Sequence, residues 1–219
     1  MAAYAMAFAS RSGLAAGPRV RAALAGRVGA DARFAQGRSG AVILVVELPE
    51  GTDPATAAEE LRAELTDATG DASLSAGVSP PVWDQGTSRL AMLQAEQALY
   101  VGRSENGKGG TVAFDALGPY CYVLGRPARD IRATSRRVLG PLAEDEPAMR
   151  DLVRTLEEYL RAHGSVKDVA RRLRVHRNTV RLRLRRIARL TGADLADADT
   201  RLTLHLAILA RRALERMAS

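Results

Sequence analysis

The stretch that decides the fold of the C-terminal third runs from Gly164 to Leu195 and reads GSVKDVARRLRVHRNTVRLRLRRIARLTGADL. Its apolar residues recur at helical spacing on either side of a short break at Arg174-Val175. They are Val166, Val169, Ala170 and Leu173 before the break and Val180, Leu184 and Ile187 after it, with Thr191 on the same face. This spacing predicts two amphipathic helices joined by a tight turn. Ser165 is expected to cap the first helix, and Thr191-Gly192 to end the second, which covers roughly residues 176–190.

Basic residues are concentrated in the same stretch. Residues 161–190 hold 11 of the 32 Lys and Arg residues and one of the 25 acidic residues, so the rest of the chain carries slightly more acids than bases. No acid lies between Val169 and Thr191, and ion pairs within the second helix therefore cannot offset the repulsion among its arginines. A positive field of this kind attracts polyanions, and duplex DNA is the polyanion whose major groove accepts a helix.

Candidate contact residues follow from the way a helix-turn-helix meets DNA. The N-terminal part of the second helix faces the base edges, while the flanking basic residues hold phosphates and set the register. The expected base-reading residues are His176, Arg177, Asn178, Thr179 and Arg181. The expected phosphate-binding residues are Ser165, Lys167, Arg171, Arg172, Arg183, Arg185 and Arg186. A simpler alternative is that His176 is a partly buried turn residue and that Asn178 and Thr179 serve only to start the helix.

The first half of the chain alternates between strand-like and helix-like segments. Strand-like runs occupy residues 3–9, 33–37, 41–48, 72–78 and 111–114, and helix-like stretches occupy residues 18–28, 54–66 and 88–101. The second helix begins well, with Asp53 as N-cap and Pro54 at the first helical position. The order predicts an α+β domain with helices on a mixed or antiparallel sheet at residues 1–125, a helical linker at 126–147 and an all-α domain at 148–219.

Several classes of function are disfavoured by composition. No apolar stretch approaches the length of a membrane helix, and no basic segment precedes the first apolar run as in a signal peptide, so we expect a cytoplasmic protein. Cys121 is the single cysteine and is expected in the core. His163 and His205 lie on separate helices, so neither a metal nor a cofactor is expected. The remaining carboxylates are expected to be solvated rather than paired for acid-base work: Asp84, Glu96, Glu105 and Asp115.

The quoted stretch closely resembles the C-terminal helix-turn-helix of the PucR/CdaR group of bacterial regulators. The resemblance rests on HRNT at residues 176–179, on the RL..I..LTG..L pattern that follows, and on LVRTLEEYL at residues 152–160. Leu182 departs from it, because many members have an aromatic residue there. Residues 3–124 are similar to the GGDEF-like domain that commonly precedes this helix-turn-helix. The hairpin at residues 36–40 reads QGRSG and lacks the acidic pair that holds metal in diguanylate cyclases, which implies a scaffold or dimerising module without catalysis.

The sequence therefore predicts a sequence-specific, DNA-binding transcription regulator that is not an enzyme and acts as a homodimer on two half-sites. The alternative is a nucleotide-processing or nucleotide-binding GGDEF-like protein with a basic accessory tail, and a third option is an RNA-binding or adaptor protein. Nothing in the sequence identifies a small-molecule effector. Relatives usually carry a sensory region ahead of the GGDEF-like part, so the chain is either a short member of the group or a truncated one.

Overall fold

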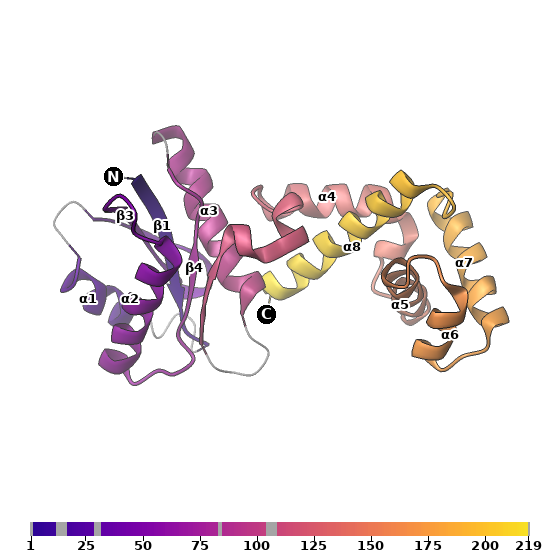
Figure 1. Cartoon of the computed structure of the whole chain (residues 1–219), viewed down its shortest axis with the longest axis horizontal. Helices are drawn as coiled ribbons and strands as arrows, with labels where there is room; N and C mark the ends of the chain where they lie inside the picture. Colours follow the sequence, from indigo (N-terminus) through magenta and orange to yellow (C-terminus); the bar gives the residue numbers. More distant parts are fainter. Residues whose placement is uncertain (1, 12–16, 29–31, 83–84, 104–108, 219) are drawn as a thin grey trace. The chain divides into compact units, whose positions relative to one another are not determined.

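The structure is a computed structural model that describes residues 2–11, 17–28, 32–82, 85–103 and 109–218. The chain divides into two compact units, residues 1–126 and residues 127–218 (Figure 1). In the described parts of both units, every helix is too short or too polar to cross a membrane. Asp84 and Glu105, which were expected to be solvated, lie outside the described residues.

A five-stranded sheet organises the first unit. Its strands are β1 (Ala2–Ala9), β2 (Arg33–Gln36), β3 (Val42–Leu48), β4 (Ser75–Val78) and β5 (Thr111–Ala113), in the spatial order β2-β3-β1-β4-β5. All neighbouring strands are antiparallel except β4 and β5, which are parallel. The first four strands and the two helices between them have the connectivity of a split βαβ motif. The expected α+β class and mixed sheet are therefore present.

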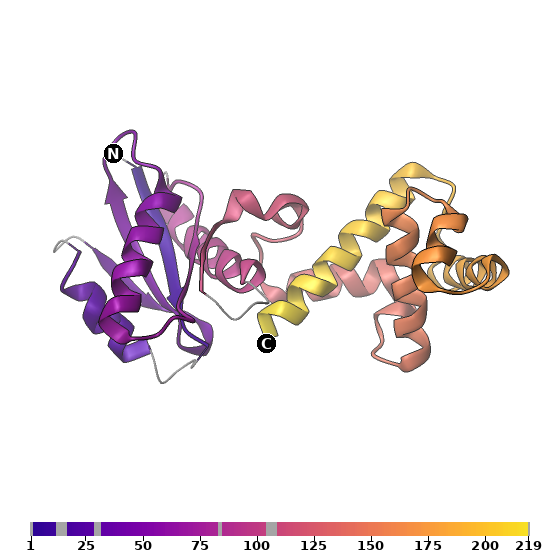
Figure 2. The ribbon, with the colours of Figure 1, turned by 60° about the horizontal axis from the view of Figure 1, so that its bottom comes forward.

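Helices cover both faces of this sheet (Figure 2). On one face, α1 (Gly17–Ala25) and α2 (Pro54–Thr69) enclose an apolar core that includes Met6 and Phe8 of β1. On the other face lies α3 (Gln85–Gly102), which packs on β1 and β4. A Cβ atom at Gly77 would lie 2.2 Å from the carbonyl oxygen of Ala95, so the glycine lets the α3 backbone approach β4 directly.

The start of α2 forms as its sequence predicts. The Asp53 carboxylate accepts hydrogen bonds from the backbone N–H of Thr56 at 2.8 Å and from its hydroxyl at 2.7 Å, and Pro54 occupies the first helical position. The helix continues three residues past the expected end and stops at Gly70, whose φ is +68°. The N-terminal boundary was easier to predict because its signals are local in sequence.

Glu96 corrects the expectation that the carboxylates of this unit are solvated. Its side chain on α3 is buried and accepts a hydrogen bond from the backbone N–H of Arg38, at the tip of the β2–β3 hairpin. The Tyr100 hydroxyl donates to the Arg38 carbonyl oxygen at 2.7 Å. A Cβ at Gly37 would lie 2.7 Å from Glu96 Oε1, so the hairpin packs closely on the carboxylate. Glu96 and Tyr100 of α3 thus bind the backbone of the hairpin tip, and these contacts join residues far apart in sequence.

The end of the first unit also differs from expectation. Residues Phe114–Tyr122 form a 3₁₀ segment, η3, that no periodicity predicted. Cys121, expected in the core, is only half-buried in it. The neighbouring Tyr122 is 77% exposed, whereas Val123 and Leu124 are buried. The short apolar run therefore predicted the wrong burial for Cys121, because a tight 3₁₀ path turns successive side chains in different directions.

The second unit is helical throughout its described residues. Its helices are α4 (Ala128–Leu139), α5 (Pro147–Arg161), α6 (Val166–Leu173), α7 (Arg177–Thr191) and α8 (Ala198–Ala218), with a 3₁₀ turn, η4 (Gly140–Ala143), after α4. The segment at 126–147, expected as a linker, lies almost entirely in this unit, because α4 packs along α8. Ile131 and Leu139 are buried, and the Ser135 hydroxyl donates to the Ala207 carbonyl oxygen at 3.0 Å.

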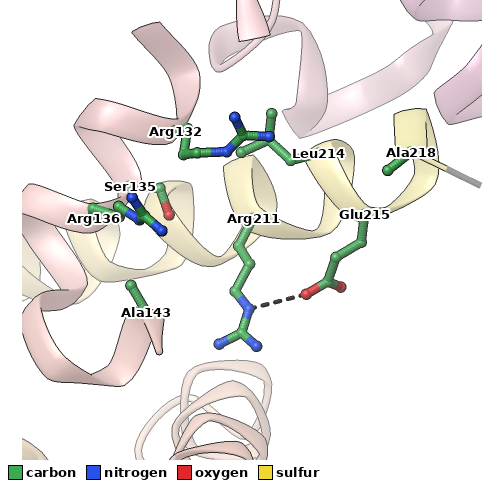
Figure 3. A pocket seen from close by; sticks show the side chains of 8 residues that line it. All are labelled: Arg132, Ser135, Arg136, Ala143, Arg211, Leu214, Glu215 and Ala218. Atoms are coloured by element: carbon green, nitrogen blue, oxygen red, sulfur yellow. Dashed lines mark hydrogen bonds and ion pairs between the residues drawn. The ribbon is translucent and has the colours of Figure 1, made fainter. Parts of the chain in front are cut away.

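A groove of about 250 Å³ lies between α4, η4 and α8 (Figure 3). Arg132 and Arg136 line it from α4, and Arg211 and Glu215 line it from α8. Arg211 is held in place: its Nε donates to Glu215 at 3.0 Å and its Nη1 to the Leu142 carbonyl oxygen at 3.0 Å. This arginine therefore joins α8 to η4 inside the unit.

Candidate nucleic-acid interface

The two helices of the quoted stretch, α6 and α7, meet through a three-residue turn. The Ser165 hydroxyl caps α6 by accepting from the Asp168 N–H at 3.3 Å, as the sequence predicts. Arg174 ends α6 in the left-handed conformation, with φ 55° and ψ 43°. The Val175 N–H then donates back to the Ala170 carbonyl oxygen at 3.0 Å. The turn is thereby closed by backbone hydrogen bonds that are typical of a helix C-terminus.

His176 begins α7. Its Nδ1 accepts a hydrogen bond from the Asn178 backbone N–H at 3.2 Å, and its carbonyl oxygen accepts from the Thr179 N–H at 2.9 Å. Arg177 and Asn178 are exposed beside it, whereas Thr179 is half-buried. His176 is therefore the N-cap of α7, and its ring is exposed rather than partly buried, at the end of α7 that the sequence assigns to base reading.

The buried side of α7 is formed by the residues that its periodicity predicts. Val180, Leu184 and Ile187 are buried in the core of the second unit. The remaining surface of the helix carries Arg177, Arg181, Arg185, Arg186 and Arg189, all exposed, which we call the arginine face. Within the described part of the chain, no carboxylate forms an ion pair with any of these five side chains. Ion pairs with described carboxylates therefore do not neutralise this positive charge, and a polyanion can do so.

Two expected phosphate-binding residues on α6 do have acidic neighbours. Arg171 forms an ion pair with Asp168 at 2.9 Å, and Arg172 forms one with Glu158 of α5 at 3.2 Å. Both arginines remain about half exposed or more, so each pair lies at the surface, where such pairs are weak and exchange readily. Lys167, on the same helix, is exposed and has no ion pair with a described carboxylate.

The Asp168 carboxyl reflects this basic surrounding. Its pKa lies below the ordinary value, chiefly because the Ser165 side chain forms a hydrogen bond with it and further because Arg171, Arg172 and Lys167 surround it with positive charge. The group therefore stays ionised and reduces the net charge of α6. The positive charge of the unit is consequently strongest along α7, which has no acid of its own.

Arg183 points toward α5 rather than to the arginine face. Its Nη2 donates to the Asp151 carboxylate at 2.9 Å and its Nη1 to the Thr155 hydroxyl at 3.2 Å, both on α5. Its side chain is 26% exposed. No acid of α7 itself opposes the arginines, as the sequence indicates, but at this position an acid comes from a helix some thirty residues earlier in the chain. Arg183 joins α7 to α5.

Arg174 was not among the expected contact residues. It is exposed in the turn directly before HRNT, next to the arginine face in sequence. The sequence did contain a signal for this residue. Arginine occupies a turn position with a left-handed backbone, which glycine adopts most easily.

Part of the second unit is similar to known proteins. Residues 152–210 match the family model described as the PucR C-terminal helix-turn-helix domain, which spans α5 through most of α8. An uncharacterized protein in the pkwA 5' region of Thermomonospora curvata is 42% identical over 79 residues, which are 36% of this chain and 44% of that protein. The purine catabolism regulatory protein of Bacillus subtilis is 37% identical over 86 residues, 39% of this chain and 16% of that protein.

A third relative matches a longer part of the chain. The transcriptional activator PmfR of Paenarthrobacter nicotinovorans is 31% identical over 123 residues, 56% of this chain and 25% of that protein. In each of these three relatives the match covers less than half of the relative's own length. Residues 152–210 thus match the PucR-type C-terminal helix-turn-helix domain, and the rest of the chain lies outside this match.

Proposed function

We propose that the chain is a sequence-specific, DNA-binding transcription regulator whose helix α7 enters the major groove of duplex DNA. The observation that carries the proposal is the arginine face: five exposed guanidinium groups on one helix, without ion pairs to described carboxylates, opposite a buried apolar stripe. The regulators named above carry a region similar to this one, which supports the same reading. Arg side chains bind guanine O6 and N7, and Asn side chains bind adenine N6 and N7.

The proposal divides the contact residues into two groups. His176, Arg177, Asn178, Thr179 and Arg181 face base edges, and Lys167, Arg171, Arg172, Arg185 and Arg186 face phosphates. Ser165 has its hydroxyl engaged as the cap of α6, so it contributes through the position of that helix. Arg183 is left out of the phosphate group, because Asp151 and Thr155 already bind it.

The test compares two kinds of variant on a binding site selected from a random duplex pool. Arg177→Ala combined with Asn178→Ala should lose the preference for the selected site over random duplex, because each base contact contributes about 1–3 kcal/mol to discrimination. Arg185→Ala should instead weaken binding to both duplexes equally and lower the slope of affinity against salt by about one. Arg137→Ala, which removes an exposed arginine on α4, is the charge-matched control. The control should bind as the parent does, and unchanged binding by the other two variants would contradict the proposal.

We further propose that two copies bind together, one on each half-site, with recognition helices about 34–36 Å apart. The selected duplex pool reports this directly, because a dimer enriches paired half-sites at one spacing. Light scattering of the complex with such a duplex should give the mass of two chains. A single chain on a site without internal symmetry would refute the dimer and leave DNA binding intact.

For the first unit we propose a GGDEF-like scaffold or dimerising module without nucleotide turnover. The Arg38 N–H at the hairpin tip is already bound by Glu96, and Tyr100 binds the carbonyl oxygen of the same residue. That amide is therefore engaged before any phosphate arrives. Incubation of the whole chain with GTP and Mg²⁺ should give no product above a blank, and measurable turnover would favour the nucleotide-processing alternative.

A further inference from the structure

Leu182 is an exposed leucine on the helix that carries the arginine face. Its exposed fraction is 58%, and it is one of four large apolar side chains that are exposed among the described residues. The other three, Leu90, Tyr122 and Leu202, belong to other segments. An isolated exposed leucine is ordinary in a soluble protein. The position of Leu182 among arginines is what requires an explanation.

The helical geometry places Leu182 opposite the core. It follows the buried Val180 by two positions, which is about 200° around an α-helix. Its neighbours at three and four positions are Asn178, Thr179, Arg185 and Arg186. Long side chains on a helix lean toward its N-terminus, so the leucine covers the surface toward Asn178. Whatever the base-reading end of α7 binds therefore also meets an apolar side chain.

Two partners could cover Leu182, namely a second copy of this chain or duplex DNA, and the charge around the leucine distinguishes between them. A second copy of this chain that docked here in a symmetric pair would bring its own arginine face against the first, and such like-charge contact costs several kcal/mol. Duplex DNA brings phosphates to the arginines and presents an apolar group in the major groove. That group is the C5 methyl of thymine, which no other DNA base carries.

We propose that Leu182 contacts the C5 methyl group of a thymine in the major groove and so selects thymine at one position of the binding site. The inference rests on the proposed function, since it requires α7 in the groove. It adds an apolar contact to the hydrogen bonds expected of Arg177 and Asn178, and it makes the side chain a determinant of specificity rather than of overall affinity.

The test removes the methyl group from the DNA instead of changing the protein. Each thymine of the selected duplex is replaced in turn by deoxyuridine, which keeps the hydrogen-bonding groups and lacks the methyl. At one position, the same in each half-site of a paired site, the parent chain should lose about fourfold in affinity, the equivalent of one buried methyl group. Leu182→Ala should bind the thymine and deoxyuridine duplexes equally well at that position.

Leu202→Ala is the matched control, because Leu202 has the same 58% exposure and lies on α8. It should keep the full fourfold dependence on the methyl group. The arm with modified DNA uses the unmodified protein, so it does not depend on the folding of any variant. Circular dichroism of Leu182→Ala should match that of the parent, since the side chain lies outside the core.

Three outcomes would overturn the inference. Equal affinity of the parent for every deoxyuridine duplex, with the Arg177 and Asn178 variant still losing specificity, would remove the methyl contact and leave the proposed function standing. A methyl dependence that Leu182→Ala retains would assign the contact to another residue. Failure of the parent to bind any duplex would end both the proposed function and this inference.

Discussion

Two residues other than glycine have positive φ angles in the described parts of the chain: His163 at 50° and Arg174 at 55°. Both lie at the ends of helices, where a left-handed residue closes the last turn. A left-handed backbone costs a residue with a Cβ atom about 1–2 kcal/mol relative to the right-handed conformation. At Arg174 this strain is located in the turn that sets α6 against α7. The position combines an unfavourable backbone with an exposed positive charge.

Arg174→Gly should raise the free energy of unfolding of the second unit by about 0.5–1 kcal/mol, because glycine adopts the left-handed conformation without a Cβ clash, although it loses more backbone entropy on folding. The measurement is thermal unfolding of the whole chain followed by far-ultraviolet circular dichroism. Arg174→Ala is the control, since it removes the charge and keeps the Cβ atom. Equal stability of the glycine and alanine variants would show that the backbone at this turn is not strained.

The elements of the second unit show what local pattern can and cannot predict. The spacing of Val180, Leu184 and Ile187 predicted the buried side of α7, and all three are in the core, because helical periodicity is a property of neighbouring residues. The partners of Arg183 could not be predicted this way. Asp151 and Thr155 lie on α5, and only the packing of α5 on α7 brings them to the arginine. The burial of Glu96 was not predicted for the same reason, because its partner, Arg38, lies far away in the sequence.

Arg183→Met should lower the free energy of unfolding by about 1 kcal/mol, because it removes the ion pair with Asp151, which is itself 63% exposed, and a hydrogen bond to the buried Thr155. Denaturant unfolding of the whole chain measures this loss. On DNA, the same variant should keep the salt slope of the parent. Arg185→Met should instead keep the stability of the parent and lower the salt slope. An unchanged stability together with a reduced salt slope for Arg183→Met would indicate that Arg183 binds a DNA phosphate.

On α8, His205 gives the stability of the second unit a dependence on pH. Its pKa lies below the ordinary value of 6.5, chiefly because of burial and further because of the charges of Arg161 and Arg212, which outweigh Glu157. The folded chain therefore favours the neutral ring, while the unfolded chain binds the proton more readily. The contribution to stability is complete above the unfolded pKa and is lost as pH falls through the folded pKa.

His205→Gln should remove this component. Thermal unfolding measured from about pH 7 down to about pH 5 should show the parent losing more stability than the variant, because only the parent carries the imidazole that titrates in that range. Carboxylates that titrate at lower pH are common to both chains and cancel in the difference. Parallel curves for parent and variant would contradict the assignment.

At the level of the whole molecule, the boundary between the two units falls between Arg126 and Pro127. The acidic run before Pro147 resembles a domain boundary in the sequence, yet it leads directly into α5, with Pro147 in the first turn. What places α4 with the second unit is its packing on α8, some seventy residues later in the chain. A contact over such a separation leaves no local signal, so composition alone suggested a linker.

A fragment of residues 127–219 should therefore fold with the helical content expected of α4 through α8. A fragment of residues 148–219 should be less stable by at least about 3 kcal/mol, since it loses the buried Ile131 and Leu139 and exposes the apolar side of α8 that they cover. Denaturant unfolding of the two fragments gives the comparison. Equal stabilities would mean that α4 is a linker after all.

The hydrogen bond at the start of α7 also restricts what the His176 ring can recognise. Because Nδ1 accepts from the Asn178 backbone, it carries no proton, and the neutral imidazole is fixed in the Nε2–H tautomer. The outer edge of the ring then offers a donor and no acceptor. In the major groove, where we propose that α7 binds, such an edge would suit the N7 atom of a purine or a phosphate oxygen and would reject the amino group of cytosine, so a capping contact inside the protein would set the polarity of a contact outside it.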